Sequence, residues 1–372
     1  MKIAEWIFPQ YQARGGRALF VNNLSKSFAL AGLNVLVVGD GDFFEESLIE
    51  ENKLLKRVNI EIQNEKLFKL GPDSVHAIRR FLKELDEFDP DIIHYHNTNH
   101  ASVVYLLSAI RKLPKRPKVI CSLHDMESVD ALITSDYAAE MISVTTYFVC
   151  PSQYIYGEVI KNTQIDPSKV KIIILGVSDV DELSPEKDRT VNQCLVVASL
   201  EAHKGTSLVL AAWPMILKKF PDAFLIVAGD GKEKIFLEEF SKTLGIERTV
   251  HFTGWLEREN LIPLFKTSWL CFVPSTIPEA FGLSAAEAQI AGVPVIASNI
   301  GGLSEIIEDD ESGFLVPPGN VSILVRASEL VLGDAEKHLT MSINAHKRAE
   351  SLFNFNRTLA QYLELFKLEN LT

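Results

Sequence analysis

The stretch WLCFVPSTIPEAFGLSAAEAQIAGVPVIAS, residues 269–298, decides the fold class. Its two ends, WLCFVPS (269–275) and PVIAS (294–298), are short apolar runs typical of strands buried on both faces of a parallel sheet. Between them a helix is predicted from about Phe281 to Gly292, because glycine after a helical run is a common stop signal. The order strand, helix, strand predicts a parallel unit with a right-handed crossover.

The same alternation of short apolar runs and amphipathic helical stretches extends through the whole chain. The runs predicted as strands are 2–8, 34–40, 91–96, 118–124, 147–152, 170–176, 192–199, 223–230, 249–254, 269–275, 294–298 and 313–317. Such a pattern predicts an α/β protein with doubly wound parallel sheets. In these sheets, ligands bind outside the carboxyl ends of the strands.

The polar segment LSPEKDRTVN, residues 183–192, is the best candidate for a linker, because it contains a proline and lacks an apolar period. It divides the chain into two Rossmann-like domains, which we expect to face each other across a cleft. We assign residues 1–182 to an N-terminal domain and residues 183–350 to a C-terminal domain. Residues 351–372 are predicted to form a helix that crosses back to the N-terminal domain.

Composition excludes several classes of function. The chain has 372 residues, of which 47% are hydrophobic, and a formal net charge of −12, which argues against general nucleic-acid binding. Its four cysteines are widely spaced and form no CxxC pair, so we expect buried thiols instead of a zinc site or a disulfide framework. The sequence contains neither a signal-peptide pattern nor an apolar stretch of 18 residues, so we expect a cytoplasmic protein.

Two glutamates, Glu279 and Glu287, lie eight positions apart around the start of the predicted helix at 281–292. The N-terminus of a helix carries unpaired N–H groups and attracts phosphates. Gly282 leaves the backbone there open to close approach. Two carboxylates beside a phosphate seat are suited to accept hydrogen bonds from sugar hydroxyls. The alternative is that both are ordinary surface glutamates.

These motifs resemble those of the retaining nucleotide-sugar glycosyltransferases of family 4 (GT4), which have the GT-B fold. PEAFGLSAAEAQIAGVPVIAS followed by IGGLSEIIEDDESGFLV is similar to the E-x7-E region of that family. VVASLEAHKG resembles its phosphate-binding loop, PDIIHYH and VICSLHD its histidine-ending strands, and the N-terminal RGG its glycine loop. Because these matches occur in order over nearly the whole chain, the resemblance is specific.

The resemblance implies that the domain of residues 1–182 binds the acceptor and that the domain of residues 183–350 binds the donor. It also implies a role for each matching residue in the second half. Glu287 would hold the ribose hydroxyls of the donor and Glu279 its sugar, while Lys204 would neutralise the diphosphate leaving group. The remaining donor contacts implied are the backbone of Phe281, Gly282, Leu283 and Ser284, together with Ser199. Ser199 is a departure, because the family usually has Gly-Arg where this chain has Ala198–Ser199, and the arginine supplies a second cation.

In the first half the resemblance implies that Gly15 and Gly16 let the backbone approach the donor phosphate. His124 would lie beside the reacting sugar as a positional residue, since the family mechanism is a same-face substitution without a clear protein nucleophile. The catalytic residues implied are therefore His124, Glu279 and Lys204. His94 and His96 share one strand face, and we expect packing or acceptor contacts from them, since no carboxylate follows at metal-ligand spacing. No metal or other cofactor is expected.

The activity implied is transfer of a hexosyl group from a nucleotide-diphosphate sugar to an acceptor hydroxyl, with retention at the anomeric carbon. The donor expected first is a UDP-sugar, with GDP- and ADP-sugars as alternatives, and the acceptor is a carbohydrate or a lipid-linked molecule. The basic segment Arg111–Lys118 is either a solvated loop or a peripheral contact with the inner membrane face. A non-catalytic or weakly active GT-B binding protein and a sugar-nucleotide epimerase are the alternative functions. Oligomeric state is not predicted.

Overall fold

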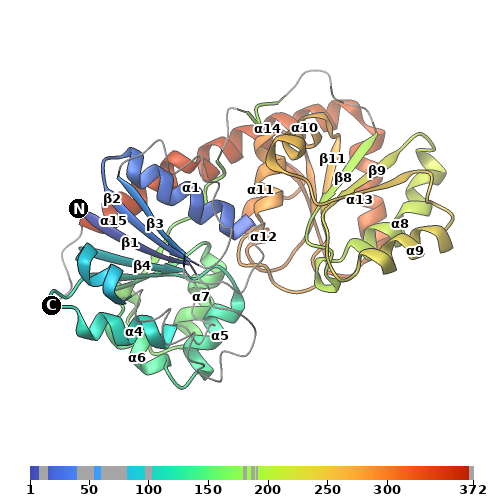
Figure 1. The fold of residues 1–372 in the computed structure, drawn as a ribbon. Helices are drawn as coiled ribbons and strands as arrows, with labels where there is room; N and C mark the ends of the chain where they lie inside the picture. The colour runs from blue at the N-terminus through green and yellow to red at the C-terminus, as the bar shows by residue number, and fades with distance from the viewer. Residues whose placement is uncertain are drawn as a thin grey trace. The chain divides into compact units, whose positions relative to one another are not determined.

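A computed structural model describes residues 1–7, 16–39, 54–59, 82–96, 103–178, 182–185, 189 and 192–367 of the chain. The chain divides into two compact units, each with its own parallel sheet (Figure 1). The first unit comprises Met1–Ile174 and Asn356–Thr372, and the second comprises Leu175–Phe355. The first unit therefore takes its polypeptide from both ends of the chain.

The sheet of the first unit has the strand order β3-β2-β1-β4-β5-β6-β7, and all of its described pairings are parallel. The strands are β1 (Lys2–Ile7), β2 (Asn34–Gly39), β3 (Leu55–Asn59), β4 (Ile92–His96), β5 (Lys118–Ser122), β6 (Tyr147–Cys150) and β7 (Val170–Ile172). The helices that the structure describes in this unit are α1 (Gly16–Leu30), α4 (Val103–Lys112), α5 (Met126–Thr134), α6 (Ala138–Val144), α7 (Gln153–Asn162) and α15 (Phe355–Lys367), with a further helical stretch at 82–88.

Helices α1 and α15 cover one face of this sheet, and α4, α5 and α6 lie on the other (Figure 1). Phe28 of α1 packs against Tyr362 and Phe366 of α15, with ring centroids 6.2 and 5.0 Å apart. On the opposite face the hydroxyl of Tyr95 in β4 lies 2.9 Å from that of Thr145, which ends α6. The C-terminal helix is thus part of the core of the first unit.

The edge strand β3 was missed from the sequence, so this sheet has one strand more than expected. Its sequence, LKRVN, carries two adjacent cations and lacks the apolar run that marks the central strands. A strand at a sheet edge pairs on one side only and tolerates charged side chains. The other strands occur where they were predicted, and most end one to three residues earlier.

The sheet of the second unit has the strand order β10-β9-β8-β11-β12-β13, again with parallel pairings. Its strands are β8 (Gln193–Val197), β9 (Phe224–Ala228), β10 (Val250–Gly254), β11 (Leu270–Val273), β12 (Val295–Ser298) and β13 (Gly313–Val316). Its α-helices are α8 (Thr206–Lys219), α9 (Lys234–Thr243), α10 (Arg258–Thr267), α11 (Leu283–Ile290), α12 (Leu303–Ile306), α13 (Val321–Gly333) and α14 (Ala335–Phe353).

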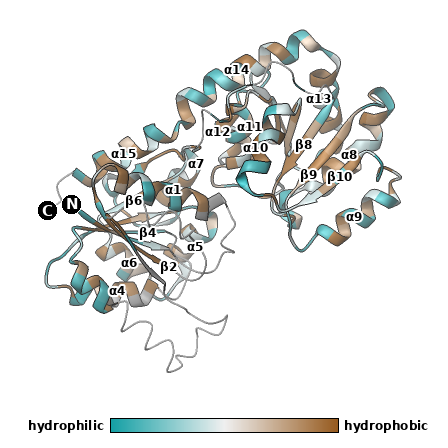
Figure 2. Cartoon of the chain, turned by 45° about the horizontal axis from the view of Figure 1, so that its top comes forward, coloured by the Kyte–Doolittle hydropathy of each residue, from teal (hydrophilic) through white to brown (hydrophobic). Residues whose placement is uncertain are grey.

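Burial explains why the apolar runs form central strands. Every residue of β4, β5, β6, β11 and β12 is buried, because helices cover both faces of a parallel sheet. Figure 2 shows the same division, with apolar strands and helices that carry hydrophilic outer faces. Among the described residues, no helix is long and apolar enough to cross a membrane.

A buried histidine joins α14 to the sheet of the second unit. The ring of His338 stacks on Trp269 with centroids 3.5 Å apart, and its Nε2 donates to the Trp269 carbonyl oxygen at 2.9 Å. Burial lowers the pKa of His338 from the usual 6.5 to about 4, although the hydrogen bond to Trp269 opposes this change, and Arg189 adds to the lowering. The folded second unit therefore favours neutral His338.

This histidine makes the second unit sensitive to mild acid. A group whose pKa is lower in the folded state contributes stability above its unfolded pKa, and that contribution is lost as the pH falls. We expect the free energy of unfolding to decrease by about 2–3 kcal/mol between pH 6.5 and pH 4 through this group. Denaturant titrations at each pH should show that the free energy of unfolding depends less steeply on pH in His338→Gln than in the wild type. Equal slopes in the two proteins would contradict the assignment.

Candidate active site

The turn after β8 brings Lys204 to the end of β11. The short 3-10 helix η2 (Ala202–Lys204) ends at Gly205, which has φ of +70°. A Cβ at Gly205 would lie 2.1 Å from the carbonyl oxygen of Pro274, so only glycine fits at this position. The amide of Thr276 donates to the carbonyl oxygen of His203 at 2.8 Å and fixes the two loops together.

Lys204 and Glu279 form an ion pair in this structure. Lys204 Nζ lies 3.0 Å from Glu279 Oε2, and both side chains are largely buried. The hydroxyl of Ser275 donates to the other carboxylate oxygen of Glu279. The backbone of Glu279 is held as well, because its carbonyl oxygen accepts from the amide of Gly302 at 2.7 Å. The two residues predicted to contact the sugar and the diphosphate are thus brought together.

Helix α11 begins where the sequence predicted it. Gly282 is its N-cap with φ of +115°, so the N–H groups of Leu283 and Ser284 belong to the first turn and lack intrahelical acceptors. A Cβ on Gly282 would lie 2.4 Å from Leu303 Cδ2 of α12. Glycine is therefore required here by backbone conformation and packing, beyond the open approach expected from the sequence. Phe281 is buried, with its ring 5.5 Å from that of Phe353.

Glu287, in the second turn of α11, is held by an arginine that the sequence analysis did not single out. Arg258, the first residue of α10, forms an ion pair with Glu287, and both side chains are largely buried. The other terminal nitrogen of Arg258 donates to the carbonyl oxygen of Ser178 at 3.4 Å. A single-sequence pattern gives little sign of this pair, because its residues lie 29 positions apart.

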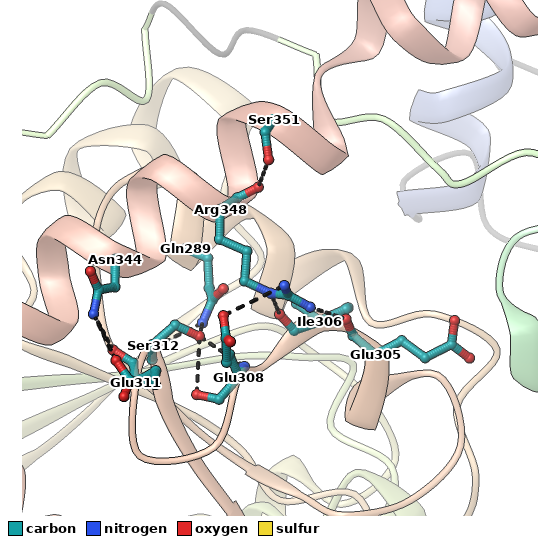
Figure 3. Close-up of polar contacts among 9 residues, drawn as sticks. All are labelled: Gln289, Glu305, Ile306, Glu308, Glu311, Ser312, Asn344, Arg348 and Ser351. Atoms are coloured by element: carbon teal, nitrogen blue, oxygen red, sulfur yellow. Dashed lines mark hydrogen bonds and ion pairs between the residues drawn. The ribbon is translucent and has the colours of Figure 1, made fainter.

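Polar contacts fasten the loop after α12 to the helices around it (Figure 3). Arg348 of α14 donates to the carbonyl oxygens of Ile306 and Glu305, the last two residues of α12, at 3.2 and 3.0 Å. Gln289 of α11 donates to both the carbonyl oxygen and the hydroxyl of Ser312 at 2.9 Å. Together they fix the segment that packs against Gly282 and the Glu279 backbone.

Ser199, where the family usually has arginine, lies exposed just after β8. Its carbonyl oxygen accepts from the amide of Glu201 at 2.9 Å, within the turn that leads to Lys204. Ser199 therefore lies on the loop that leads to Lys204, and its short side chain supplies no positive charge. Lys204 carries the charge that this loop directs toward Glu279.

In the first unit His124 follows β5 and is half-buried. Its Nε2 lies 2.8 Å from Nδ1 of His96, and the two rings are stacked with centroids 5.1 Å apart. Gly16 is the first residue of α1, whereas Gly15 lies outside the described residues. Asp125, the residue after His124, caps α5 by accepting from the amide of Ser128 at 2.7 Å.

His94 and His96 share one strand face as predicted, but the expectation that no carboxylate accompanies them is wrong. Glu5, in the middle of β1, is level with His94 in the neighbouring strand and is fully buried. Its Oε1 lies 3.1 Å from His94 Nδ1 and its Oε2 lies 2.9 Å from His96 Nε2. The carboxylate was missed because it comes from a different strand, at a distance in sequence that ligand-spacing rules do not cover.

Glu5 is ionised in this environment. Burial by itself would raise the pKa of its carboxyl, but charge interaction and hydrogen bonds with His94 and His96 outweigh burial and hold that pKa well below its usual range. Within the part of the chain that the structure describes, Glu5, His94 and His96 form the group whose atoms are close enough to hold a metal ion.

The basic segment Arg111–Lys118 has several of its cations engaged with the protein. Arg111 pairs with Glu140 at 3.1 Å, Lys115 pairs with Asp91, and Lys118 donates to the carbonyl oxygen of Phe366 at 2.9 Å. Arg111 lies in α4 and Lys118 in β5, so the segment extends beyond a loop and part of its positive charge is bound within the protein. A membrane contact through it stays a prediction.

Comparison with known proteins now gives the class. The model for "Glycosyl transferases group 1" matches residues 179–348, and that for "Glycosyltransferase Family 4" matches residues 14–180. An uncharacterized glycosyltransferase of Methanocaldococcus jannaschii is 28% identical over 75% of each chain, and a glycogen synthase of Mycobacterium tuberculosis is 26% identical over 95% of this chain and 91% of its own. The crystal structure of Anabaena HepE in complex with UDP-glucose matches with a TM-score of 0.81 and 22% identity, over 98% of this chain and 99% of that one.

The two parallel sheets are thus those of a GT-B glycosyltransferase. Since the two family models together extend over nearly the whole chain, this protein belongs to the family 4 glycosyltransferases. The family shows the kind of enzyme, a glycosyltransferase.

The position of Lys204 depends on Gly205, and this can be tested by substitution. Gly245 is a matched control, because it lies in the same unit with φ of +69° and a Cβ there would meet nothing within 4 Å. We expect Gly245→Ala to lower the free energy of unfolding by about 1 kcal/mol through backbone strain alone. Gly205→Ala should lower it by about 2–4 kcal/mol, because overpacking adds to the strain. Equal losses in chemical denaturation would contradict the close approach to Pro274.

Proposed function

We propose that this protein is a retaining glycosyltransferase that transfers a hexosyl group from a UDP-sugar to a hydroxyl group of a carbohydrate or lipid-linked acceptor. The observation that carries the proposal is the cluster at the carboxyl ends of β8 and β11. There Lys204 pairs with Glu279 in the loop before α11, and Glu287 lies in the second turn of that helix. Each of these groups suits a different part of a nucleotide-sugar.

Lys204 and the start of α11 suit the diphosphate. The N–H groups of a first helical turn and a nearby ammonium group both stabilise phosphate charge. In this structure Lys204 forms an ion pair with Glu279. A donor would offer the lysine a stronger anionic partner and the glutamate a set of sugar hydroxyls. As the bond to the sugar breaks, Lys204 would stabilise the charge that develops on the diphosphate.

Glu287 suits the ribose. A carboxylate accepts hydrogen bonds from two neighbouring hydroxyls at once. Arg258 orients this carboxylate through an ion pair that is largely shielded from water. Because Ser199 adds no second cation to the diphosphate, the cluster relies on Lys204 more than the usual family site would.

We also propose that the reaction needs no metal ion. The positive charge at the diphosphate would come from Lys204 and the α11 N-terminus. In the described residues the group with metal-ligating potential is Glu5 with His94 and His96, which is buried in the first unit, whereas the donor cluster belongs to the second unit.

Retention would follow from attack on the same face from which the diphosphate departs. The departing phosphate would then accept the proton of the acceptor hydroxyl, so that no protein nucleophile is needed. His124 would contribute from the first unit as a hydrogen-bonding group beside the sugar. UDP is the preferred nucleotide because the similar HepE was crystallised with UDP-glucose.

The donor site is tested by incubating the purified protein with UDP-, GDP- and ADP-sugars and measuring nucleotide release and binding. We expect Lys204→Ala to slow turnover about 100-fold or more, because it removes the charge that stabilises the leaving group. Glu287→Ala should weaken donor binding about 10–100-fold through lost hydrogen bonds to a charged group. Lys219→Ala is the matched control, since it removes a lysine at the end of α8 that is paired with Glu329 of α13 at 2.6 Å. It should change neither quantity.

The outcome separates the competing functions. Donor binding without turnover, unaffected by Glu279→Ala, would indicate a binding protein in place of an enzyme. Conversion of the sugar-nucleotide to its epimer would indicate an epimerase. If none of the three nucleotide-sugars shifts the thermal unfolding midpoint, the proposal is wrong.

Stereochemistry and metal dependence are tested on the same reaction. Proton NMR of the first product formed should show the anomeric configuration of the donor. Activity should survive dialysis against EDTA, and added Mg²⁺ or Mn²⁺ should not raise it. An inverted product would contradict retention, and loss of activity on chelation that is restored by a metal would contradict the metal-free site.

A further inference from the structure

A chain of buried hydrogen bonds runs from His124 into the interior of the first unit. His124 bonds to His96, His96 to Glu5, and Glu5 to His94. The chain continues from His94 Nε2 to the hydroxyl of Ser122 at 2.8 Å, and from there to the hydroxyl of Tyr362 in α15, also at 2.8 Å. Four segments of the sequence thus meet in one polar line inside an apolar core.

The ring nitrogens of this group are engaged in hydrogen bonds with the protein. His94 uses Nδ1 for Glu5 and Nε2 for Ser122, and His96 uses Nε2 for Glu5 and Nδ1 for His124. A metal ion would need a lone pair from each ring and would break two of these bonds. The arrangement therefore favours a proton-ordering function over a metal site.

The charge on Glu5 orders the protons along the line. An ionised carboxylate accepts only, so His94 must donate from Nδ1 and His96 from Nε2. One proton lies between His96 Nδ1 and His124 Nε2. When both rings are neutral, His96 has its lone pair at Nδ1, so His124 donates from Nε2 and has its own lone pair at Nδ1. When the pair holds one more proton, His124 carries an N–H at Nδ1 as well. The positive charge then lies on whichever of the two rings holds the proton between them.

We propose that Glu5 is a positioning residue for His124: through His96, it fixes which nitrogen of His124 is protonated and favours an added proton on the His96–His124 pair. The inference rests on the proposed function in one respect, that His124 lies beside the reacting sugar. His124 would then present either a donor or an acceptor to a sugar hydroxyl, and Glu5 would set the pH at which it changes.

The titratable groups that face Glu5 in the described part of the unit are few. His94 and His96 from β4 bond to Glu5 directly, the charge of Glu5 acts on Tyr362 from α15, and His124 after β5 is joined to Glu5 only through His96. On the other side of β1, strand β2 presents Val37 at the level of Glu5. The negative charge of Glu5 therefore acts mainly on the histidines.

The first test measures the proton order directly and needs no enzymatic activity. Full-length protein labelled with ¹⁵N at histidine is titrated by NMR, with His96 and His124 assigned from single-residue variants. We expect His96 to be protonated at Nε2 in the wild type. In Glu5→Gln, the pH at which the His96–His124 pair gains its extra proton should fall by about one unit or more, because a neighbouring negative charge is lost.

Tyr95→Phe is the matched control. Tyr95 lies between His94 and His96 in the same strand, but its side chain is on the opposite face of the sheet. The substitution removes its buried hydrogen bond to Thr145. It should lower the thermal unfolding midpoint without moving the titration of the pair. If Glu5→Gln does not fold, His96→Gln interrupts the line at its middle and should likewise lower the pH at which His124 titrates. Unchanged titration in the folded variant would overturn the proposal.

The second test asks whether the protonation of the His96–His124 pair affects the reaction. The pH profile of kcat for nucleotide release should shift toward acid in Glu5→Gln by the same amount as the NMR titration. A shifted titration with an unshifted pH profile would overturn the positioning role. A wild-type protein without turnover would refute the proposed function instead, while the NMR result stands by itself. Zn²⁺ that binds stoichiometrically and moves the His94 and His96 signals would overturn the hydrogen-bond line in favour of a metal site.

Discussion

Parallel pairing of the strands is the constraint on which the rest of the structure depends. A parallel strand can be followed by its neighbour only after the chain has crossed back over the sheet. All described pairings in both units are parallel, so the loops after successive strands gather at one edge. The turn after β8 and the loop after β11 are neighbours for this reason. Lys204 and Glu279, 75 positions apart in the chain, meet because their strands pair directly.

Much of the fold could be predicted because buried parallel strands have a simple signature. Short apolar runs such as LCFV in β11 and VIAS in β12 are hydrophobic on both faces, and their order predicts the two sheets. The edge strand β3 could not be found this way, since its exposed side allows charged residues. The start of α11 was predictable from Gly282, although the structure shows that its packing against Leu303 requires glycine as well.

The polar contacts of the site were less predictable, because they join residues far apart in sequence. The pairing of Arg258 with Glu287 depends on how α10 lies beside α11. Glu5 did leave a sign, as a charged residue in the middle of the apolar run KIAEWI. A carboxylate buried in a central strand requires partners, and His94 and His96 of the adjacent strand provide them. An isolated charge in a central strand is thus a reason to examine the neighbouring strands for complementary groups.

The packing of α15 in the first unit has a consequence for synthesis on the ribosome. Tyr362, Leu365 and Phe366 are buried in that unit, and Lys118 is anchored to the carbonyl oxygen of Phe366. The first unit therefore lacks part of its core until Tyr362, Leu365 and Phe366 have been translated, whereas the sequence of the second unit is complete at Phe355. Domains usually fold in the order in which they are made. Here the unit whose strands are translated first is completed after the other unit, and a product truncated before α15 would expose the apolar surface that α15 covers.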